Sequence, residues 1–511
     1  MVFNFFVMLK YLLQYLLKLI AVKYKIKILT ILKKDIFADI LKKKFGFYYK
    51  NSPAYLLSRM NNDIENLDGM LATNLITALL AMMQILTIIM FMGKINIVLM
   101  IMVIVIKAIE LYVKVRFPLK EIYKAHNEAL AQLDKSTQNT FSNIKLIKIA
   151  NGMSKETRRY QTALDMYFAK RARRDNVNVI RETASRFLVE SSYPIIVILG
   201  GLSAYYGYMT LGAVIAFIMY FQKLTPLFNE AAYIVPIYKI SQASAERIGE
   251  LLDSENEDVA IGKRLNGISS IELKNLTFSY GQHRVLDNIN MKLEPQRITA
   301  IIGVSGSGKS TIVNLLLGFL KPDSGEILIN GKNMREYNIN EIRKCISVLF
   351  QETPLFQRSL KENLAYHCAT NERFEKYYGE ICQKADIQNV VRRFDSLSCA
   401  ITQDNGGDLS GGEKQRLCLA RELYKNVSVN IFDEATSALD AVSENIIMHS
   451  IKQLAKENMV LIITHKMKNV KDADIIYVLD EGEIKASGTH EELMGKSGKY
   501  TELYNEQMKE E

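Results

Sequence analysis

The chain has 511 residues, which is too long for one ordinary domain and predicts two or three. Lys and Arg outnumber Asp and Glu by 65 to 55, so the formal net charge is +10. A basic balance can indicate a nucleic-acid partner, but here the basic residues flank long apolar stretches, which is typical of the cytoplasmic loops of membrane proteins. We therefore expect a lipid bilayer as a partner and no nucleic acid.

The N-terminal half holds about five apolar segments of membrane-spanning or near-spanning length. They cover residues 2–22, 71–92, 95–115, 187–208 and 211–237. The loops at 93–94 and 207–210 are short and carry little charge. The loops at 23–50 and 114–186 are long and rich in Lys and Arg, which places them in the cytosol and the short loops outside. This alternation argues against the alternative that the segments are buried helices of a soluble bundle.

The C-terminal half follows a different pattern. Residues 271–280 alternate between apolar and polar side chains, which predicts a half-buried strand. Short apolar strands are also predicted at residues 298–302, 427–432 and 460–464. A helix is predicted at 311–320. Strands and helices in this arrangement predict an α/β domain with a largely parallel sheet.

These patterns together predict a multidomain membrane protein in which an all-α transmembrane domain precedes an α/β domain. The polar and acidic stretch between the two halves indicates a linker. The expected boundaries are residues 1–245 for the transmembrane domain with long cytoplasmic helical loops, 246–268 for the linker and 269–511 for the α/β domain.

Residues 303–310 read Gly-Val-Ser-Gly-Ser-Gly-Lys-Ser and lie between a predicted strand and a predicted helix. Strand, glycine-rich loop and helix in this order form a phosphate-binding loop, whose backbone N–H groups surround the phosphates. Lys309 would reach the outer phosphates, and the Ser310 hydroxyl can ligate Mg²⁺. The predicted nucleotide-binding residues are Gly303, Val304, Ser305, Gly306, Ser307, Gly308, Lys309, Ser310 and Thr311.

A second motif, Leu-Ser-Gly-Gly-Glu, lies at residues 409–413. With the phosphate-binding loop it resembles the ABC ATPases, whose LSGG signature closes over ATP bound by a second nucleotide domain. The resemblance covers nearly all of residues 271–511 and implies a dimer. It also implies that ATP is contacted in trans by the signature and D-loop residues Ser410, Gly411, Gly412 and Asp440.

Three residues that follow predicted strands suit ATP hydrolysis, which needs a held metal and a base that acts on water. Asp433 is placed to hold Mg²⁺ through water, and Glu434 comes next as the predicted general base. His465 follows the strand at 460–464. Alone, a histidine there is more often structural, but within this ordered set it matches the switch histidine that contacts the γ-phosphate in ABC ATPases.

The same resemblance implies two further contacts with ATP. Tyr280 matches the aromatic residue that stacks on adenine, although alone it would indicate a core or edge tyrosine. Gln351 matches the Q-loop glutamine, which senses Mg²⁺ and contacts the membrane domain. The implied cofactors are therefore ATP and Mg²⁺, and the expected Mg²⁺ ligands are Ser310, Gln351 and Asp433.

The membrane half is similar to that of ABC exporters. Residues 47–63 and 141–150 resemble their first and second intracellular loops, which carry short coupling helices that dock on the nucleotide domain. Fusion of the membrane domain before the ATPase also fits exporters. One departure is at residues 402–406, where exporters usually show Gly-Glu; Asp404 keeps the acid but the glycine is gone.

A second departure concerns the N-terminus. The apolar segment at 2–22 runs almost directly into the first intracellular loop, so it corresponds to the family's second helix and the first is absent. Five spans with a cytoplasmic ATPase would put the N-terminus outside. A misplaced start codon or a fragment is an alternative at least as well supported as a true five-span protein.

The resemblance implies ATP-driven export of an unidentified substrate, such as a lipid, a peptide or a drug-like molecule, across the cytoplasmic membrane. The expected unit is a dimer of two ABC half-transporters, with a homodimer favoured over a heterodimer, in the cell membrane with a cytoplasmic ATPase domain. The alternative is a truncated or partner-dependent subunit that has ATPase activity but does not transport alone. The predicted spans argue against a soluble ABC ATPase.

Overall fold

The computed structural model describes the chain except for Met1 and residues 69–72, 117–118, 258–261, 352–353, 369, 395, 402–408, 437–440, 497 and 511. The chain forms two compact units. The first contains Met1–Ala38 and Ala54–Asp253, and the second contains Asp39–Pro53 and Ser254–Glu511. The segment Asp39–Pro53 therefore groups with the C-terminal residues, although it lies in the N-terminal half of the sequence.

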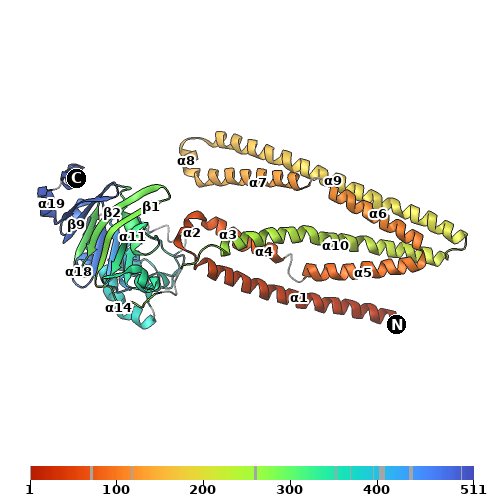
Figure 1. Cartoon of the computed structure of the whole chain (residues 1–511), viewed down its shortest axis with the longest axis horizontal. Coiled ribbons are helices and arrows are strands. Elements are labelled where there is room, and N and C mark those ends of the chain that lie inside the picture. Colours follow the sequence, from red (N-terminus) through yellow and green to blue (C-terminus); the bar gives the residue numbers. More distant parts are fainter. Residues whose placement is uncertain are drawn as a thin grey trace. The chain divides into compact units, whose positions relative to one another are not determined.

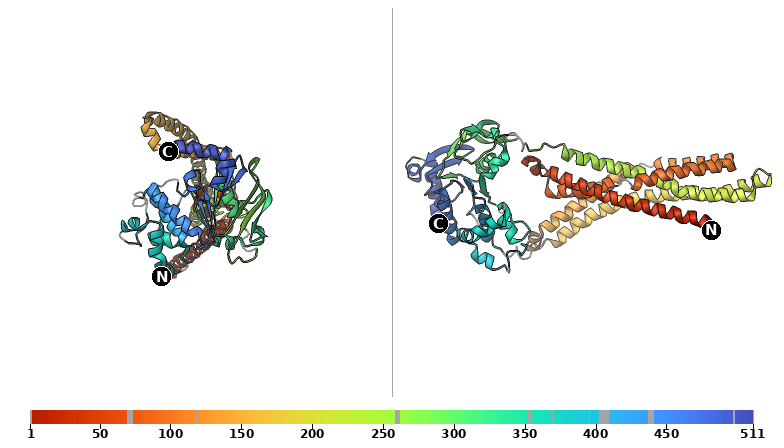
Figure 2. Two further views of the ribbon diagram at one scale, coloured as in Figure 1. Left: turned by 90° about the vertical axis from the view of Figure 1, so that its left-hand side faces the viewer. Right: turned by 90° about the horizontal axis from the view of Figure 1, so that it is seen from below.

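The first unit is built of helices (Figure 1). Its elements are α1 (Val2–Ile40), α3 (Pro53–Ser58), the π-helix η1 (Arg59–Asp63), α4 (Ile64–Asp68), α5 (Thr73–Ile95), α6 (Ile97–Arg116), α7 (Leu119–Ser142), α8 (Ile144–Ile149), α9 (Met153–Tyr205) and α10 (Leu211–Leu252). α7 and the first part of α9 lie side by side and are joined through α8 (Figure 2). α10 continues to Leu252, so residues 246–252 of the predicted linker are helical.

Three helices are long and apolar enough to cross a membrane when only the described residues are considered. They are α5 over Thr77–Ile95, α9, and α10 over Leu211–Ala231. The predicted span at 2–22 lies in α1, whose side chains are described only in part. The predicted span at 95–115 lies mostly in α6, where Lys107 and Glu110 interrupt the apolar sequence.

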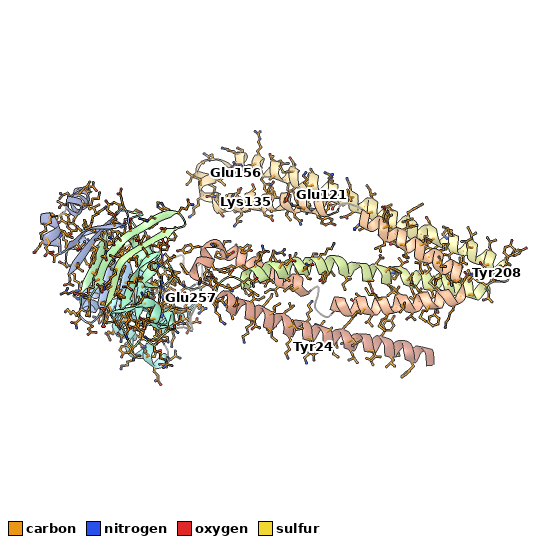
Figure 3. All side chains as sticks on the ribbon, viewed as in Figure 1. Tyr24, Glu121, Lys135, Glu156, Tyr208 and Glu257 are labelled. Atoms are coloured by element: carbon orange, nitrogen blue, oxygen red, sulfur yellow. The ribbon has the colours of Figure 1, made fainter. Side chains whose placement is uncertain are left out.

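Large apolar side chains on these helices are exposed, as a lipid-facing surface requires. Met83 on α5 is 67% exposed and Ile198 on α9 is 60% exposed. By contrast, α7 and the start of α9 carry charged side chains such as Glu121, Lys135 and Glu156, which suit water (Figure 3). The two compositions separate a part that suits a membrane from charged segments that suit water.

The second unit is an α/β domain with two sheets. A six-stranded sheet has the order β10-β9-β3-β8-β7-β6, and a four-stranded antiparallel sheet has the order β2-β1-β4-β5. In the larger sheet only β10 (Glu483–Gly488) runs antiparallel, so the prediction of a largely parallel sheet is confirmed. The other strands are β1 (Ile271–Tyr280), β2 (His283–Leu293), β3 (Ile298–Ile302), β4 (Ser324–Ile329), β5 (Lys332–Asn333), β6 (Ile346–Leu349), β7 (Val429–Asp433), β8 (Met459–Ile463) and β9 (Ile475–Asp480).

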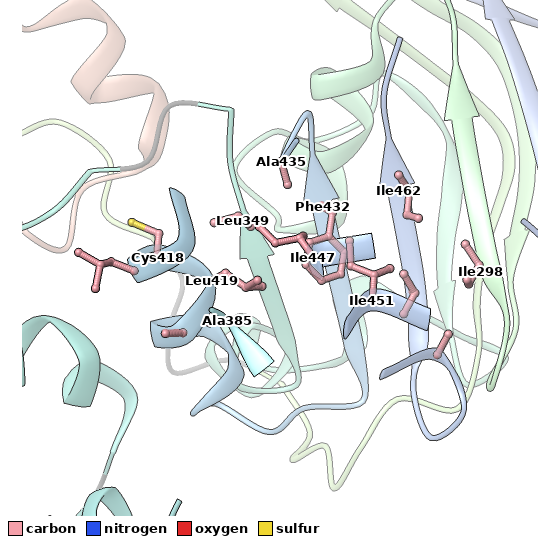
Figure 4. Packing of buried hydrophobic residues seen from close by; sticks show 14 of the residues in the cluster. Ile298, Leu349, Ala385, Cys418, Leu419, Phe432, Ala435, Ile447, Ile451 and Ile462 are labelled. Atoms are coloured by element: carbon pink, nitrogen blue, oxygen red, sulfur yellow. The ribbon is translucent and has the colours of Figure 1, made fainter. Parts of the chain in front are cut away.

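The second unit also contains helices. They are α2 (Phe45–Lys50), α11 (Lys309–Leu316), α12 (Ile339–Lys344), α13 (Leu360–Leu364), α14 (Asn371–Lys384), α15 (Gln388–Arg392), α17 (Gly411–Leu423), α18 (Ala441–Ala455), α19 (His490–Lys496) and α20 (Gly498–Glu510). One core packs Leu419 of α17 and Ile447 of α18 against Phe432 of β7 (Figure 4). β3, β7 and β8 are buried along their whole length, which explains their continuous apolar sequences.

Candidate functional site

The phosphate-binding loop, Asp433, Glu434, His465 and Gln351 lie at one edge of the six-stranded sheet, whereas Tyr280 ends a strand of the smaller sheet. β3, β8, β7 and β6 are parallel neighbours in that order, so their carboxyl ends lie at the same edge. The phosphate-binding loop follows β3, and Asp433 ends β7. His465 and Gln351 come shortly after β8 and β6. Ligands of open α/β sheets bind at this edge.

Glycine is required at two crowded positions of the phosphate-binding loop. A Cβ atom on Gly303 would lie 2.1 Å from the carbonyl oxygen of Leu479. Gly308 has a φ of +104°, and a Cβ atom there would lie 2.6 Å from Leu286 Cδ2. The loop leads directly into α11, whose first N–H groups favour an anion.

Two polar side chains of this loop are buried, those of Lys309 and Ser307. Lys309 is buried, and its Nζ donates to the carbonyl oxygens of Gly303 and Val304, each at 2.8 Å. Burial lowers the pKa of Lys309. The hydroxyl oxygen of Ser307 is buried without a hydrogen-bond partner among the described residues. A buried cation beside an unpartnered hydroxyl fits a bound phosphate group.

Asp433 suits a magnesium ion. It is buried, which raises the pKa of its carboxyl, although the Ser310 hydroxyl that donates to it opposes this shift. A cation beside the carboxylate would lower the pKa again. In the described part of the chain, no group of three or more His, Cys, Asp or Glu side chains could hold a metal ion. One carboxylate nevertheless fits Mg²⁺, which is usually held by one or two carboxylates together with nucleotide phosphates.

Glu434 and His465 lie next to each other. Glu434 Oε1 is 3.4 Å from His465 Nδ1, and the Glu434 N–H donates to the carbonyl oxygen of Ile463 at 2.8 Å. Glu434 has a φ of +50°, a left-handed conformation that is uncommon outside glycine and that clusters at functional sites. The backbone therefore turns immediately after β7 and brings this carboxylate to the loop that follows β8.

Tyr280 and Gln351 are both exposed. Tyr280 ends β1 with 46% exposure, and its ring packs edge-on against Phe278 with 4.9 Å between centroids. The ring is therefore available to stack on a planar group, as the adenine assignment requires. Gln351 lies two residues beyond the end of β6, and its side chain faces solvent.

The signature motif forms the start of α17. Ser410 Oγ accepts from the Glu413 N–H at 3.2 Å, and Glu413 Oε2 accepts from the Ser410 N–H at 2.8 Å, which is a capping box. Ser410 and Gly411 are exposed, and Gly412 is half-buried. The helix N-terminus at Gly411 and Gly412 is thus fixed in place and suits an anion from another molecule. Asp440 and the departure at residues 402–406 lie outside the described residues.

The segment around α2 contacts the C-terminal residues of the second unit. The Phe45 ring stacks on the Phe319 ring at 4.3 Å, and the Arg343 guanidinium lies 4.7 Å from the centre of the Phe319 ring. Arg343 also donates twice to the Glu257 carboxylate, at 2.7 and 2.6 Å. The backbone of this segment bonds to the linker as well, since the Glu257 N–H donates to the Lys42 carbonyl oxygen at 2.7 Å. Phe45 and Lys42 lie just before residues 47–63, the segment that resembles the first intracellular loop of exporters, so the docking of a coupling helix stays a prediction.

Sequence reasoning missed a buried polar network beside the site. Glu444 on α18 and Lys466 after His465 form an ion pair at 2.9 Å between Oε1 and Nζ. In the sequence, these two residues stand out only by their positions: Glu444 follows the predicted D-loop, and Lys466 directly follows the predicted switch histidine, His465. Burial of a charged residue cannot be read from one sequence, so the pattern alone did not single them out.

Two family models match different parts of the chain. Residues 1–226 match the family model "ABC transporter transmembrane region", and residues 286–437 match the family model "ABC transporter". A solved structure of a bacterial Atm1-family ABC exporter with ATP bound superposes with a TM-score of 0.80 at 22% identity, over 95% of this chain and 86% of that one. The predicted fold class, a helical transmembrane domain followed by an α/β ABC ATPase domain, is therefore confirmed.

Curated relatives carry different names. The human ABC-type oligopeptide transporter ABCB9 is 29% identical over 489 residues, covering 93% of this chain and 63% of that protein. The ATP-dependent lipid A-core flippase of Xylella fastidiosa (strain Temecula1 / ATCC 700964) is 30% identical over 390 residues, covering 75% and 65%. The chain thus spans less than two thirds of the length of these two relatives. The two family matches, which cover residues 1–226 and 286–437, and the order of the two domains place this chain in the ABC transporter family.

Proposed function

We propose that the chain is one half of a dimeric exporter that hydrolyses ATP to move a substrate across the cell membrane, with the nucleotide domain in the cytoplasm. The observation that carries this proposal is the convergence of the phosphate-binding loop, Asp433, Glu434 and His465 at one sheet edge, in a chain that also has membrane-spanning helices. A nucleotide domain fused to such helices has a direct means of passing its movements to them.

Each residue has a separate task in this mechanism. Backbone N–H groups of the loop and the Lys309 ammonium bind the phosphates, which requires Lys309 to leave the carbonyl oxygens that it now contacts. Ser310 and Asp433 hold Mg²⁺. Glu434 orients a water molecule and accepts its proton. His465 contacts the Glu434 carboxylate and would also contact the γ-phosphate of bound ATP. Bound MgATP supplies the phosphoryl group and the charge that is neutralised.

The second half of the site comes from another chain in this proposal. The exposed, capped N-terminus of α17 at Ser410 and Gly411 offers N–H donors to a phosphate that a partner domain holds. A second copy of this chain is the favoured partner, because this chain carries both the phosphate-binding loop and the signature. The relatives' names refer to oligopeptides and to lipid A core. Lipid, peptide and drug-like substrates therefore all remain candidates.

A two-stage experiment tests the proposal. The full chain is purified in detergent and its ATPase activity is compared with that of Lys309→Ala, which should lose phosphate binding. Inverted membrane vesicles are then screened for ATP-dependent uptake of labelled lipids, peptides and drug-like molecules. Wild-type hydrolysis above the Lys309→Ala background with uptake supports an exporter. Hydrolysis without uptake favours a partner-dependent subunit, and no hydrolysis contradicts the proposal.

A further inference from the structure

Two loops at the candidate site are tied together by side chains from one of them. The loop after β7 carries Glu434 and continues to Thr436, and the loop after β8 carries His465 and continues to Lys466. Lys466 Nζ donates to the Thr436 carbonyl oxygen at 2.9 Å. Asn469 Nδ2 donates to Thr436 Oγ1 at the same distance. The distance between Glu434 and His465 therefore depends on these two bonds as well as on the strands.

Both donors also bind one buried carboxylate. Glu444 lies in the first turn of α18 and is 4% exposed. Its Oε1 accepts from Lys466 Nζ at 2.9 Å and from Asn469 Nδ2 at 2.8 Å, and its Oε2 lies 3.3 Å from Lys468 Nζ. Burial opposes ionisation of Glu444, but its hydrogen bonds outweigh burial and lower its pKa. The carboxylate is thus held in its charged form with several donors around it.

We infer that Glu444 is a positioning residue for ATP hydrolysis. By fixing Lys466 and Asn469, it keeps the loop of Glu434 and the loop of His465 at the separation that the reaction needs. The described contacts of Glu444 run to Lys466, Asn469, Lys468 and Thr436, so it acts through these neighbours. The inference rests on the proposed function, because it assigns Glu444 a role in that same site.

The location of Glu444 strengthens this argument. α18 begins directly after the predicted D-loop at residues 437–440, so Glu444 anchors the helix that follows that loop. Ser443, the residue before Glu444 on α18, accepts a hydrogen bond from Arg416 of α17. The start of α18 therefore receives contacts from the signature helix and from the loop after β8, and a displacement of Glu444 would reach both.

The first test compares Glu444→Gln with Glu457→Gln, an exposed glutamate just beyond the end of the same helix. Glutamine keeps the shape of the side chain but removes the charge that holds the two lysines. We expect Glu444→Gln to lower kcat by about tenfold while the KM for ATP stays within about threefold. Glu457→Gln should match the wild type. A kcat for Glu444→Gln within about twofold of the wild type would overturn the inference.

A double mutant separates positioning from general loss of stability. Lys466→Gln removes the bridge from the other side, and the double variant Glu444→Gln with Lys466→Gln removes both partners. If the two residues act through one network, the double variant loses no more activity than the worse single variant. Additive losses would contradict the network, because they would show that each residue acts independently.

Hydrogen exchange of the nucleotide-free protein gives a readout that does not depend on activity. Glu444→Gln should speed exchange in peptides covering residues 432–436 and 464–469 and at the start of α18, with no change in strands away from the network such as β1 and β2, and Glu457→Gln should change none of these. Unchanged exchange in both peptides, or faster exchange throughout the unit, would overturn the inference. If the wild type lacked ATPase activity, the proposed function would fail, while the exchange result would still decide whether Glu444 positions the two loops.

Discussion

Lys107 Nζ lies 2.8 Å from Glu110 Oε2 within α6, and each of these residues is only 5% exposed. Lys107 also donates to Thr225 Oγ1 on α10 at 3.1 Å, and Ser185 Oγ on α9 donates to Glu110 Oε1 at 2.8 Å. One ion pair therefore links three helices inside a stretch that the sequence pattern assigns to the bilayer. Ionisable residues at such positions are costly unless they are paired.

Removal of one partner should damage the membrane domain more than removal of both. Lys107→Met leaves the Glu110 charge buried and uncompensated, which typically costs about 3–5 kcal/mol. The double variant Lys107→Met with Glu110→Gln removes both charges and should recover much of the loss. Thermal stability in detergent, followed by size-exclusion chromatography after heating, measures the difference. If the double variant were less stable than Lys107→Met, the pair would not be the stabilising element.

Asp63 holds the C-terminal part of α10 by a similar network. It is buried at the end of the π-helix η1, and its carboxylate accepts from Ser244 Oγ at 2.9 Å, from Arg59 Nη1 at 2.7 Å and from Arg247. Burial opposes its ionisation, but these donors outweigh burial and lower the pKa of Asp63 to about 2. The π-helix η1 thus ends with a carboxylate that lies between two arginines, Arg59 and Arg247.

Asp63→Asn should destabilise the protein at neutral pH by about 2 kcal/mol, because a shift of nearly two pKa units corresponds to that free energy. The folded-state pKa is lower than the usual value of 3.8, so the stabilisation is fully present above about pH 4 and is lost as the pH falls towards 2. Melting curves between pH 7 and pH 3 test this. Asp165→Asn, at an exposed position on α9, is the control. A stability difference that stays constant below pH 4 would contradict the assignment.

Glu434→Gln should separate nucleotide binding from hydrolysis. The amide can still contact His465 but cannot accept a proton from water, so turnover should fall by about 10²- to 10⁴-fold. Lys309→Ala should instead weaken nucleotide binding itself. Binding of a fluorescent ATP analogue and phosphate release, measured on the same preparations, distinguish the two effects. Near-normal phosphate release by Glu434→Gln would show that another group is the base.

The fold and the phosphate-binding loop were predictable because their signals are local. A glycine-rich loop between a strand and a helix is encoded within about twenty residues, and apolar strands such as 298–302 show their burial directly. Contacts between distant segments have no such signal. Glu110 and Ser185, or Asp63 and Arg247, meet only in the folded chain, and each looks like an ordinary charged or polar residue in the sequence. The grouping of residues 39–53 with the nucleotide domain is hidden for the same reason.

The central claim is that two chains form each ATP site, and a pair of tagged dimers tests it most directly. Both dimers carry Ser410→Arg and Lys309→Ala once each. In the first, the two substitutions are on different chains, and in the second they share one chain beside a wild-type chain. If the signature acts in trans, the first dimer keeps one intact site and hydrolyses ATP, while the second has no intact site and does not. Activity in the second dimer and none in the first would contradict the account.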